Sequence, residues 1–357
     1  MATLSKKVMI DYRSDTVTRP SAAMRRAMAE AEVGDDVLRE DPTMLKLENR
    51  AADITGKEAA LFVPSGTFAN QLALFTWVPA GGEVYINETT HIIQYEAGAS
   101  AHISAAFLRP FTPRETPWAE WSDIAPRLRS VNRDQHYPKA SLICLENALS
   151  SGRVQPLASM EKVRQGAQKS GLPIHLDGAR LFNAALALKL SADVLAKLAD
   201  SVCFCLSKGL GAPVGSLLCG SKDFIEEAFY KRKIMGGGMR QVGVLAAAGL
   251  VALNEELPRL KEDHLHARAL AAAFGEFTTF EVLNPQPEIN MVFLRLQEAS
   301  TARNNRLFSL LREAGILTYA PEDGVFRFVT HRDVTAKQIA HTQKKLPSIV
   351  ESLEEDN

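Results

Sequence analysis

The residue of this chain whose surroundings point most clearly to chemistry is Lys208. It follows the apolar run 201–206 and Ser207, and it is flanked by Gly209 and Gly211. Glycines at these positions let the backbone approach a ligand closely and adopt positive φ. Burial disfavours the ammonium form of a lysine, so the neutral amine that reacts with a carbonyl group becomes accessible near neutral pH. Considered alone, the segment also fits a surface loop.

An aspartate closes a second apolar run. Asp177 ends the run 173–177 and precedes Gly178. A carboxylate at such a strand end can keep a pyridine nitrogen protonated, which the chemistry of pyridoxal phosphate (PLP) requires. An exposed loop aspartate is the ordinary alternative. Combined with the lysine, Asp177 favours PLP carried as a Schiff base on Lys208.

A short polar segment, Ser65-Gly66-Thr67, separates an apolar run from a helix-like stretch. Hydroxyl groups, backbone amides and a helix N-terminus at this place can bind a phosphate group. The same residue types also begin many helices as simple caps. The lysine, the aspartate and this segment together predict a PLP-dependent enzyme that acts on an amino acid.

The elements that must position these residues follow from the apolar runs. Strand-like runs alternate with helical spacing, which predicts a mostly parallel, doubly wound sheet. Ligands of such sheets bind at the carboxyl ends of strands, where Ser65, Glu146, Asp177 and Lys208 all fall. The predicted strands are 60–64, 141–146, 173–177, 201–206 and a return strand at 214–219. Beyond about residue 250, helices at 257–274 and 301–314 and strands at 289–296 and 324–330 predict a smaller α/β domain.

The composition is that of an ordinary globular protein, with 46% hydrophobic residues, 23% charged residues and a formal net charge of -1. This balance gives no electrostatic reason to bind nucleic acid or an anionic membrane. No apolar run approaches the roughly 20 residues of a membrane span, and the N-terminus is too short and polar for a signal peptide. We therefore expect a cytoplasmic protein.

The cysteines and several histidines have ordinary structural interpretations. The four cysteines lie in apolar runs whose spacing indicates neither a zinc site nor a disulfide framework, so we expect buried thiols and no metal site. We expect His175 to be a satisfied core histidine. His264 and His266 lie on a charged helix and are predicted to be solvated.

Longer motifs surround the candidate residues. They are 11–20 (beginning Asp-Tyr-Arg-Ser-Asp), 33–37 (Val-Gly-Asp-Asp-Val), 64–67, 95–98, 176–183 (beginning Leu-Asp-Gly-Ala-Arg), 205–215, 236–241 (Gly-Gly-Gly-Met-Arg-Gln) and 326–331 (Phe-Arg-Phe-Val-Thr-His). These motifs resemble those of the L-threonine aldolases, PLP enzymes of the aspartate aminotransferase-like fold (fold type I), over nearly the whole chain. The resemblance implies a mostly parallel seven-stranded sheet and a smaller C-terminal α/β domain. We expect an N-terminal segment at 1–17, a PLP-binding domain at 18–250 and a small domain at 251–357.

The resemblance implies a role for each residue that matches the family's motifs. The cofactor would be bound by Ser65, Gly66, Thr67, His91, Asp177, Arg180, Ser207, Lys208 and Arg240, the last from a neighbouring subunit. The substrate would be bound by Ser14, Arg180, Arg327, Lys233, Leu38 and Tyr95, with Ser14 and the two arginines on its α-carboxylate. Lys208, His91 and His136 would be catalytic, and the histidines would move protons.

The implied reaction is retro-aldol cleavage of an L-3-hydroxy-α-amino acid to glycine and an aldehyde. Racemisation and β-elimination on the same scaffold are alternatives, and so is a degenerate relative that only binds. The family implies a homodimer at least and favours a homotetramer.

Two departures from the family's motifs concern the substrate. Leu38 and Arg39 replace the tyrosine and glycine that usually follow Gly-Asp-Asp-Val, and residues 148–153 replace a polar, histidine-bearing loop. These changes predict an apolar pocket that favours bulky substrates such as phenylserine over threonine or allo-threonine.

Overall fold

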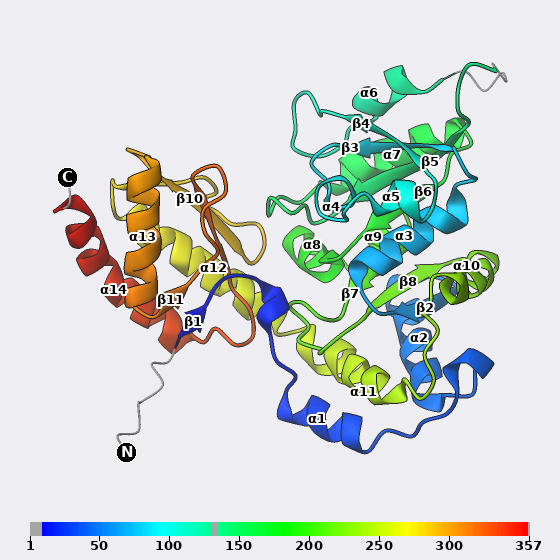
Figure 1. Cartoon of the computed structure of the whole chain (residues 1–357), viewed down its shortest axis with the longest axis horizontal. Helices are drawn as coiled ribbons and strands as arrows, with labels where there is room; N and C mark the ends of the chain where they lie inside the picture. Colours follow the sequence, from blue (N-terminus) through cyan, green and yellow to red (C-terminus); the bar gives the residue numbers. More distant parts are fainter. Residues whose placement is uncertain (1–8, 130–134, 356–357) are drawn as a thin grey trace. The chain divides into compact units, whose positions relative to one another are not determined.

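The structure of the chain is a computed structural model that describes residues 9–129 and 135–355. It forms two compact units, residues 20–257 and residues up to 19 together with 258–357. The described part of the predicted N-terminal segment, residues 9–17, groups with the smaller unit. The reason is a non-local pairing, because strand β1 (Ile10–Asp11) lies parallel to β11 (Ile316–Leu317). Figure 1 shows the elements of each unit along the chain.

The larger unit contains a seven-stranded sheet with the order β2-β8-β7-β6-β5-β3-β4. Its strands are β2 (Ala59–Val63), β3 (Glu83–Asn87), β4 (Phe107–Phe111), β5 (Ala140–Glu146), β6 (Ile174–Asp177), β7 (Ser201–Cys205) and β8 (Ser216–Gly220). The five strands from β7 to β4 are mutually parallel, and β8 runs antiparallel to both of its neighbours. The predicted fold class, an α/β protein with a mostly parallel seven-stranded sheet, is confirmed.

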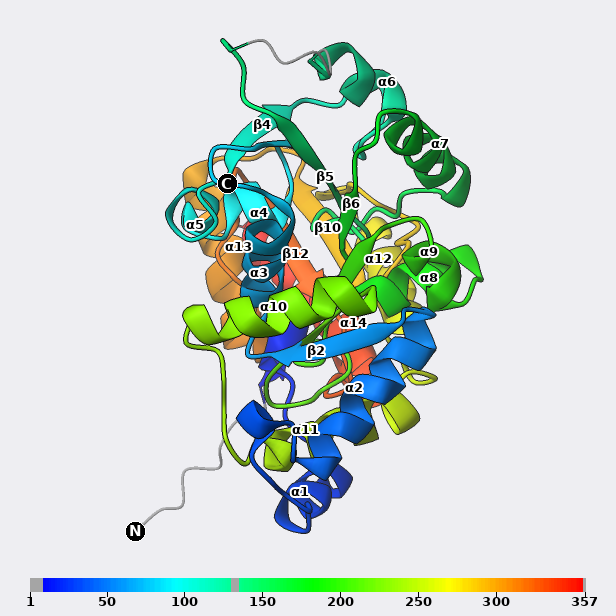
Figure 2. The ribbon, with the colours of Figure 1, turned by 90° about the vertical axis from the view of Figure 1, so that its right-hand side faces the viewer.

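Helices cover both faces of this sheet (Figures 1 and 2). Leu61 and Val63 of β2 share one apolar cluster with residues of α3 and α10. Phe62 points to the other face, where α2 lies, and its backbone amide donates a hydrogen bond to Glu48 of that helix. In Figure 2, α10 lies across β2. The helices are α1 (Ala22–Ala29), α2 (Pro42–Thr55), α3 (Gly66–Trp77), α4 (His91–Gln94), α5 (Ala99–His102), α6 (Trp121–Ile124), α7 (Leu157–Lys169), α8 (Leu181–Leu188), α9 (Ala192–Ala196), α10 (Lys222–Ile234) and α11 (Gly243–Val251).

The smaller unit has its own apolar core. An antiparallel sheet of β12 (Val325–Val329), β10 (Met291–Leu296) and β9 (Phe280–Val282) packs with α12 (Leu260–Gly275), α13 (Thr301–Glu313) and α14 (Ala336–Glu354). Phe274 contacts the rings of Phe280 and Phe328 at centroid distances of 5.2 and 4.9 Å. Such aromatic contacts add to the burial energy of the core.

Several structural expectations can now be compared with the fold. All four cysteines are buried and free, and His175 is buried with both ring nitrogens hydrogen-bonded, as expected. The expectation for His264 was wrong, because this side chain is buried on the inner face of α12, while His266 is half-buried. In the part of the chain that the structure describes, no helix is long and apolar enough to cross a membrane.

Candidate active site

Lys208 lies just beyond the carboxyl end of β7, and its side chain is half-buried. The turn that carries it is closed by a hydrogen bond from the amide of Gly211 to the carbonyl of Lys208 at 2.9 Å. Gly211 adopts φ +73°, which a residue with a side chain rarely tolerates, whereas Gly209 does not need positive φ. The glycine requirement inferred from the sequence therefore applies to Gly211.

Asp177 ends β6, the strand next to β7, and its side chain is 2% exposed. Its Oδ1 accepts a hydrogen bond from the amide of Ala179 at 3.0 Å, and its Oδ2 accepts one from the Asn70 side chain at 2.7 Å. Two donors stabilise the charged form of a buried carboxylate. Asp177 is thus held as a fixed acidic group on the same sheet edge as Lys208.

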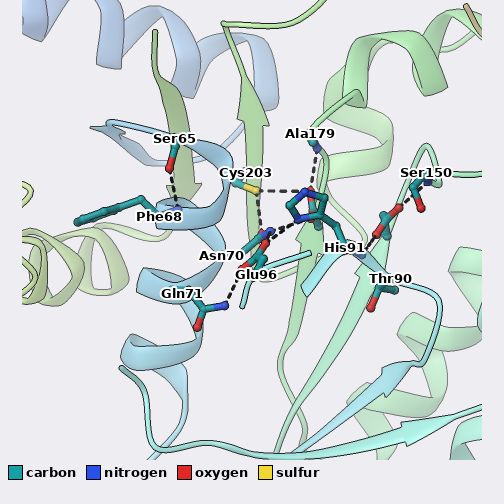
Figure 3. Close-up of polar contacts among 12 residues, drawn as sticks. Ser65, Phe68, Asn70, Gln71, Thr90, His91, Glu96, Ser150, Ala179 and Cys203 are labelled. Carbon is teal, nitrogen blue, oxygen red and sulfur yellow. Dashed lines mark hydrogen bonds and ion pairs between the residues drawn. The ribbon is translucent and has the colours of Figure 1, made fainter. Parts of the chain in front are cut away.

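The segment Ser65-Gly66-Thr67 forms the N-terminus of α3, at the end of β2. Ser65 is the N-cap, and its Oγ accepts a hydrogen bond from the amide of Phe68 at 3.1 Å (Figure 3). A Cβ atom on Gly66 would stand 2.8 Å from Cys205 Sγ, so only glycine lets this turn approach the end of β7 so closely. The arrangement places the positive end of a 12-residue helix beside the lysine-bearing strand.

His91 begins the short helix α4 and is held at two points. Its backbone amide donates to Glu146 Oε2 at 2.7 Å, and its Nδ1 lies 2.9 Å from Glu96 Oε1 (Figure 3). Because an ionised carboxylate only accepts, Nδ1 carries the hydrogen and Nε2 is the nitrogen left for proton transfer. The hydrogen bond to Glu96 raises the pKa of His91, and the charges of Asp177 and Lys208 also act on the ring.

Glu96 is the functional residue that sequence reasoning missed, although it lies within a matched motif. It is 2% exposed, and besides His91 it accepts hydrogen bonds from the side chains of Asn70 and Gln71 at 2.8 and 2.6 Å. A buried carboxylate that orients a histidine follows the logic of catalytic triads. The signal available in the sequence was the pair of polar residues, Asn70 and Gln71, inside an otherwise apolar helix.

Glu146, predicted among the polar strand ends, joins two loops of the site. Besides the amide of His91, its carboxylate accepts the amide of Ser150 at 2.6 Å, so it connects α4 to the loop after β5. Burial and the neighbouring charge of Asp177 raise the pKa of Glu146 to about 7. The loop after β5 contains Ala148 and Leu149, both 4% exposed, where the family's motif has polar residues.

His136 does not lie near this group within the chain, and its catalytic role stays a prediction. It is exposed and lies four residues before β5 begins, at the amino end of that strand. Along β5, the first residue lies about 20 Å from Glu146, from the rise of an extended strand. The proximity of Tyr137 and Pro138 in the sequence reflects a loop, so His91 is the only predicted catalytic histidine on the carboxyl edge among the described residues.

Four other predicted residues are exposed on the larger unit. Leu38 is 62% exposed at the end of a 3-10 turn (Asp36–Leu38), and Tyr95 is 57% exposed with its ring 5.6 Å from that of His91. Lys233 is exposed near the end of α10. Arg240 is exposed as well, and its guanidinium pairs with Asp35 at 2.6 Å. Because they are exposed, these four side chains could contact a neighbouring chain.

The loop that carries Leu38 is anchored by a departure from the family's motif. Arg39 adopts φ +60°, where the family has glycine, and its guanidinium lies 2.7 Å from Glu48 Oε2. Glu48 is 2% exposed, and although Arg39 lowers the pKa of Glu48, burial raises it further, so the net shift is upward. Arg39 therefore compensates a buried charge at the cost of backbone strain.

Replacing Arg39 with glycine is expected to destabilise the protein by about 1–2 kcal/mol, since a buried carboxylate loses its partner. The raised pKa of Glu48 gives the sign of the pH dependence. Glu48 becomes charged as the pH rises, and without Arg39 that buried charge has no partner. The loss of unfolding free energy in the variant should therefore be larger at about pH 8 than at about pH 5. Urea unfolding measures both values.

Lys189→Gly is the matched control, because Lys189 is exposed and also left-handed, with φ +58°. Relief of strain without loss of a buried pair should leave its stability equal or slightly higher. Equal stability changes in the two variants would show that the contact with Glu48 contributes nothing.

The remaining predicted residues occupy defined positions. Arg180, half-buried, is the N-cap of α8 directly after the Asp177 strand. Ser14 and Arg327 belong to the smaller unit. There Ser14 is buried with its Oγ accepting the amide of Thr16, and the Arg327 guanidinium lies 5.9 Å from the Tyr319 ring centroid. Their roles toward the substrate stay predictions.

The larger unit's residues fit PLP. Lys208 supplies an amine, Asp177 a fixed buried carboxylate for the ring nitrogen, and the α3 N-terminus a place for the phosphate group. Gly66 lets this helix N-terminus lie close to the end of β7, since a Cβ there would stand 2.8 Å from Cys205 Sγ. A reactive amine, an acid and an anion site on neighbouring strand ends form the set that PLP requires.

Comparison with known proteins agrees with this chemistry. The beta-eliminating lyase family profile matches residues 11–298. The chain is 44% identical to low-specificity L-threonine aldolase 1 of Arabidopsis thaliana over 336 residues, covering 93% of this chain and 94% of that protein. It is 39% identical to the low specificity L-threonine aldolase of Escherichia coli over 332 residues, covering 93% and 96%.

Solved structures agree in fold. A putative L-allo-threonine aldolase from Listeria monocytogenes superposes with a TM-score of 0.80 at 22% identity, covering 96% of this chain and 97% of that one. The fold type I assignment is thereby confirmed. The chain therefore belongs to the beta-eliminating lyase family, within it to the L-threonine aldolases, and is a PLP-dependent lyase.

Proposed function

We propose that this enzyme cleaves L-3-hydroxy-α-amino acids, including threonine and allo-threonine, to glycine and an aldehyde. The observation that carries the proposal is the pairing of a fixed histidine with the lysine and aspartate on one sheet edge. His91, with Nδ1 bound to Glu96, offers Nε2 as the base that a substrate hydroxyl needs. Relatives at 39–44% identity bear the name low-specificity L-threonine aldolase, which supports the same reaction.

Each residue has a definite task in this proposal. Lys208 holds the cofactor, and Asp177 keeps the ring nitrogen protonated. When bound, PLP supplies an electron sink for the bond that breaks at the substrate Cα. His91 Nε2 accepts the proton of the β-hydroxyl group, and Glu96 stabilises the imidazolium that results. Arg180 binds the α-carboxylate and so helps to determine which bond of Cα is oriented for cleavage.

Product analysis tests the reaction against its alternatives. Supplied with PLP and L-threonine, the enzyme is expected to release glycine and acetaldehyde in equal amounts. β-Elimination would release 2-oxobutanoate and ammonia instead, and racemisation at Cα would produce D-allo-threonine without glycine. Formation of 2-oxobutanoate or of D-allo-threonine in place of glycine would refute the proposal, and the family name makes β-elimination the relevant second candidate.

The substrate preference is predicted from the two departures. With Leu38 in place of a phenol and Leu149 in place of a polar loop, we expect kcat/KM to be higher for L-phenylserine than for L-threonine. An apolar contact of this kind contributes about 1–3 kcal/mol, so the preference should be about 10- to 100-fold. A clear preference for threonine would contradict it. Leu38→Tyr should reduce the ratio of the two kcat/KM values.

The exposure of Leu38, Lys233 and Arg240 supports a site shared between subunits, in a homodimer or a homotetramer. Lys208→Ala and Arg240→Ala proteins, each inactive at limiting PLP, should recover activity when their subunits exchange. In dimers formed at random, half are mixed and one site of each is intact, so about a quarter of wild-type activity should return. No recovery after demonstrated exchange would place Arg240 at its own chain's site or at none.

A further inference from the structure

A single amide group, that of Asn70, lies between the carboxylates of Glu96 and Asp177; Figure 3 shows Asn70 beside Glu96. Asn70 Nδ2 lies 2.8 Å from Glu96 Oε1 and 2.7 Å from Asp177 Oδ2. Since both partners are carboxylates, the NH₂ group faces them and gives one hydrogen to each. Asn70 is 1% exposed, so no bulk water can replace these hydrogens.

The other end of Asn70 is fixed by a chain of donors. His175 Nε2 and Cys203 Sγ lie 3.1 and 3.2 Å from Asn70 Oδ1. Burial lowers the pKa of His175 to about 4, so this ring is neutral and carries one hydrogen. Trp77 Nε1 can only donate, and it donates to the Ser201 hydroxyl at 2.8 Å, so the hydroxyl hydrogen is available for His175 Nδ1 at 2.9 Å. With Nδ1 accepting, we assign the ring hydrogen to Nε2.

This chain determines the orientation of the amide. Every donor from Trp77 onward points toward Asn70, so a flipped amide would place its oxygen against two carboxylates and its hydrogens against two donors. A fully satisfied buried network has one arrangement, and each bond strengthens the next. Asn70 is therefore held with its NH₂ group toward the site.

The arrangement matters because the two carboxylates are close. A ring nitrogen of His91 and one carboxylate oxygen each of Glu96 and Asp177 lie within 4.8 Å of one another. Buried like charges this close cannot both stay ionised without compensation. We propose that Asn70 is a positioning residue that keeps Glu96 and Asp177 ionised together and so holds His91 with Nε2 open for proton transfer.

Loss of the amide should therefore change the charge state of the site. We expect the added cost of the two like charges to fall on Glu96, because bound PLP would give Asp177 a cationic partner through its ring nitrogen. A neutral Glu96 no longer favours the imidazolium form of His91. The other titratable groups near the ring, Glu146 and Lys208, make no contact with Asn70 that its replacement would remove.

The test is an NMR titration of the histidine rings in the PLP-loaded protein, with the His91 signal assigned through His91→Gln. Asn70→Leu is expected to lower the His91 titration midpoint by about one pH unit or more. Glu96→Gln should cause the same fall, and the double variant should add no further fall. Gln71→Leu removes another buried amide donor from Glu96 but leaves the bridge, so its effect should be clearly smaller.

An unchanged midpoint in a folded Asn70→Leu protein would overturn the inference. So would an equal further fall in the Glu96→Gln background, or an equal fall in Gln71→Leu. If Asn70→Leu does not fold, Asn70→Ser, which retains one hydrogen to donate, should lower the midpoint in the same direction. The inference rests on the proposed role of His91, but the titration needs no substrate, so its failure leaves the product analysis to decide the reaction.

Discussion

Lys208→Ala is expected to lose activity on the order of 10⁴-fold or more, because no other described residue supplies an amine at the carboxyl end of β7. The protein should also lose the visible absorbance of lysine-bound PLP. Both effects arise from one side chain, so they should appear together. Steady-state glycine formation and the absorbance spectrum of the PLP-loaded protein measure them.

The matched control is Lys222→Ala, at the start of α10. Lys222 is an exposed lysine of the same unit, and its replacement should leave both the spectrum and the rate unchanged. Retained glycine formation and an unaltered spectrum in Lys208→Ala would instead require a different lysine to carry the cofactor.

Asp177→Asn is expected to lower kcat by about 10²–10³-fold, the usual cost of removing one fixed electrostatic group from a buried active site. The amide has nearly the shape of the carboxylate but cannot stabilise a protonated pyridine nitrogen. PLP affinity should fall as well. Expressed as a free energy, the fall in kcat should exceed any fall in the free energy of unfolding. Thermal unfolding of the same samples measures the second quantity.

Asp200→Asn is the control, because it makes the same chemical change at the amino ends of the parallel strands. Asp200 precedes β7 and accepts hydrogen bonds from the amide of Ile174 and from Arg164 at 2.8 and 2.6 Å. It should lower stability without lowering kcat. A similar fall of kcat in both variants would mean that Asp177 acts through the fold and has no direct role in the chemistry.

Much of this site is predictable because strand ends carry their polar residues in the sequence. The runs that became β2, β5, β6 and β7 ended within one residue of their predicted carboxyl ends. The parallel sheet then brought Ser65, Glu146, Asp177 and Lys208 to one edge. For this part of the site, the position of each polar residue directly after an apolar run was sufficient.

The parts that were missed depend on contacts distant in sequence. Strand β4 contains Pro110 and lies at the sheet edge, where a proline costs no ladder hydrogen bond, so its pattern was weak. The pairing of β1 with β11 spans about 300 residues and has no local signal. Glu96 gained its role only when α3 brought Asn70 and Gln71 against it.

The catalytic role of His136 stays a prediction. A histidine close to a strand was placed at the site by resemblance, although it precedes that strand while the other candidates follow theirs. Strand polarity alone decides between the two edges of a parallel sheet. The loop after Glu146, where the family's motif has a histidine, holds Ala148 and Leu149, which leaves proton transfer to His91 in the proposed reaction.

Borohydride reduction of the PLP-loaded protein tests the assignment of Lys208 most directly. The reduction attaches the cofactor permanently to the lysine that carries it, and mass spectrometry of the digested protein locates the modified peptide. We predict modification of the peptide that contains Lys208, and none there in Lys208→Ala. Modification of another lysine, such as Lys233, or of no lysine would contradict a cofactor site at the end of β7.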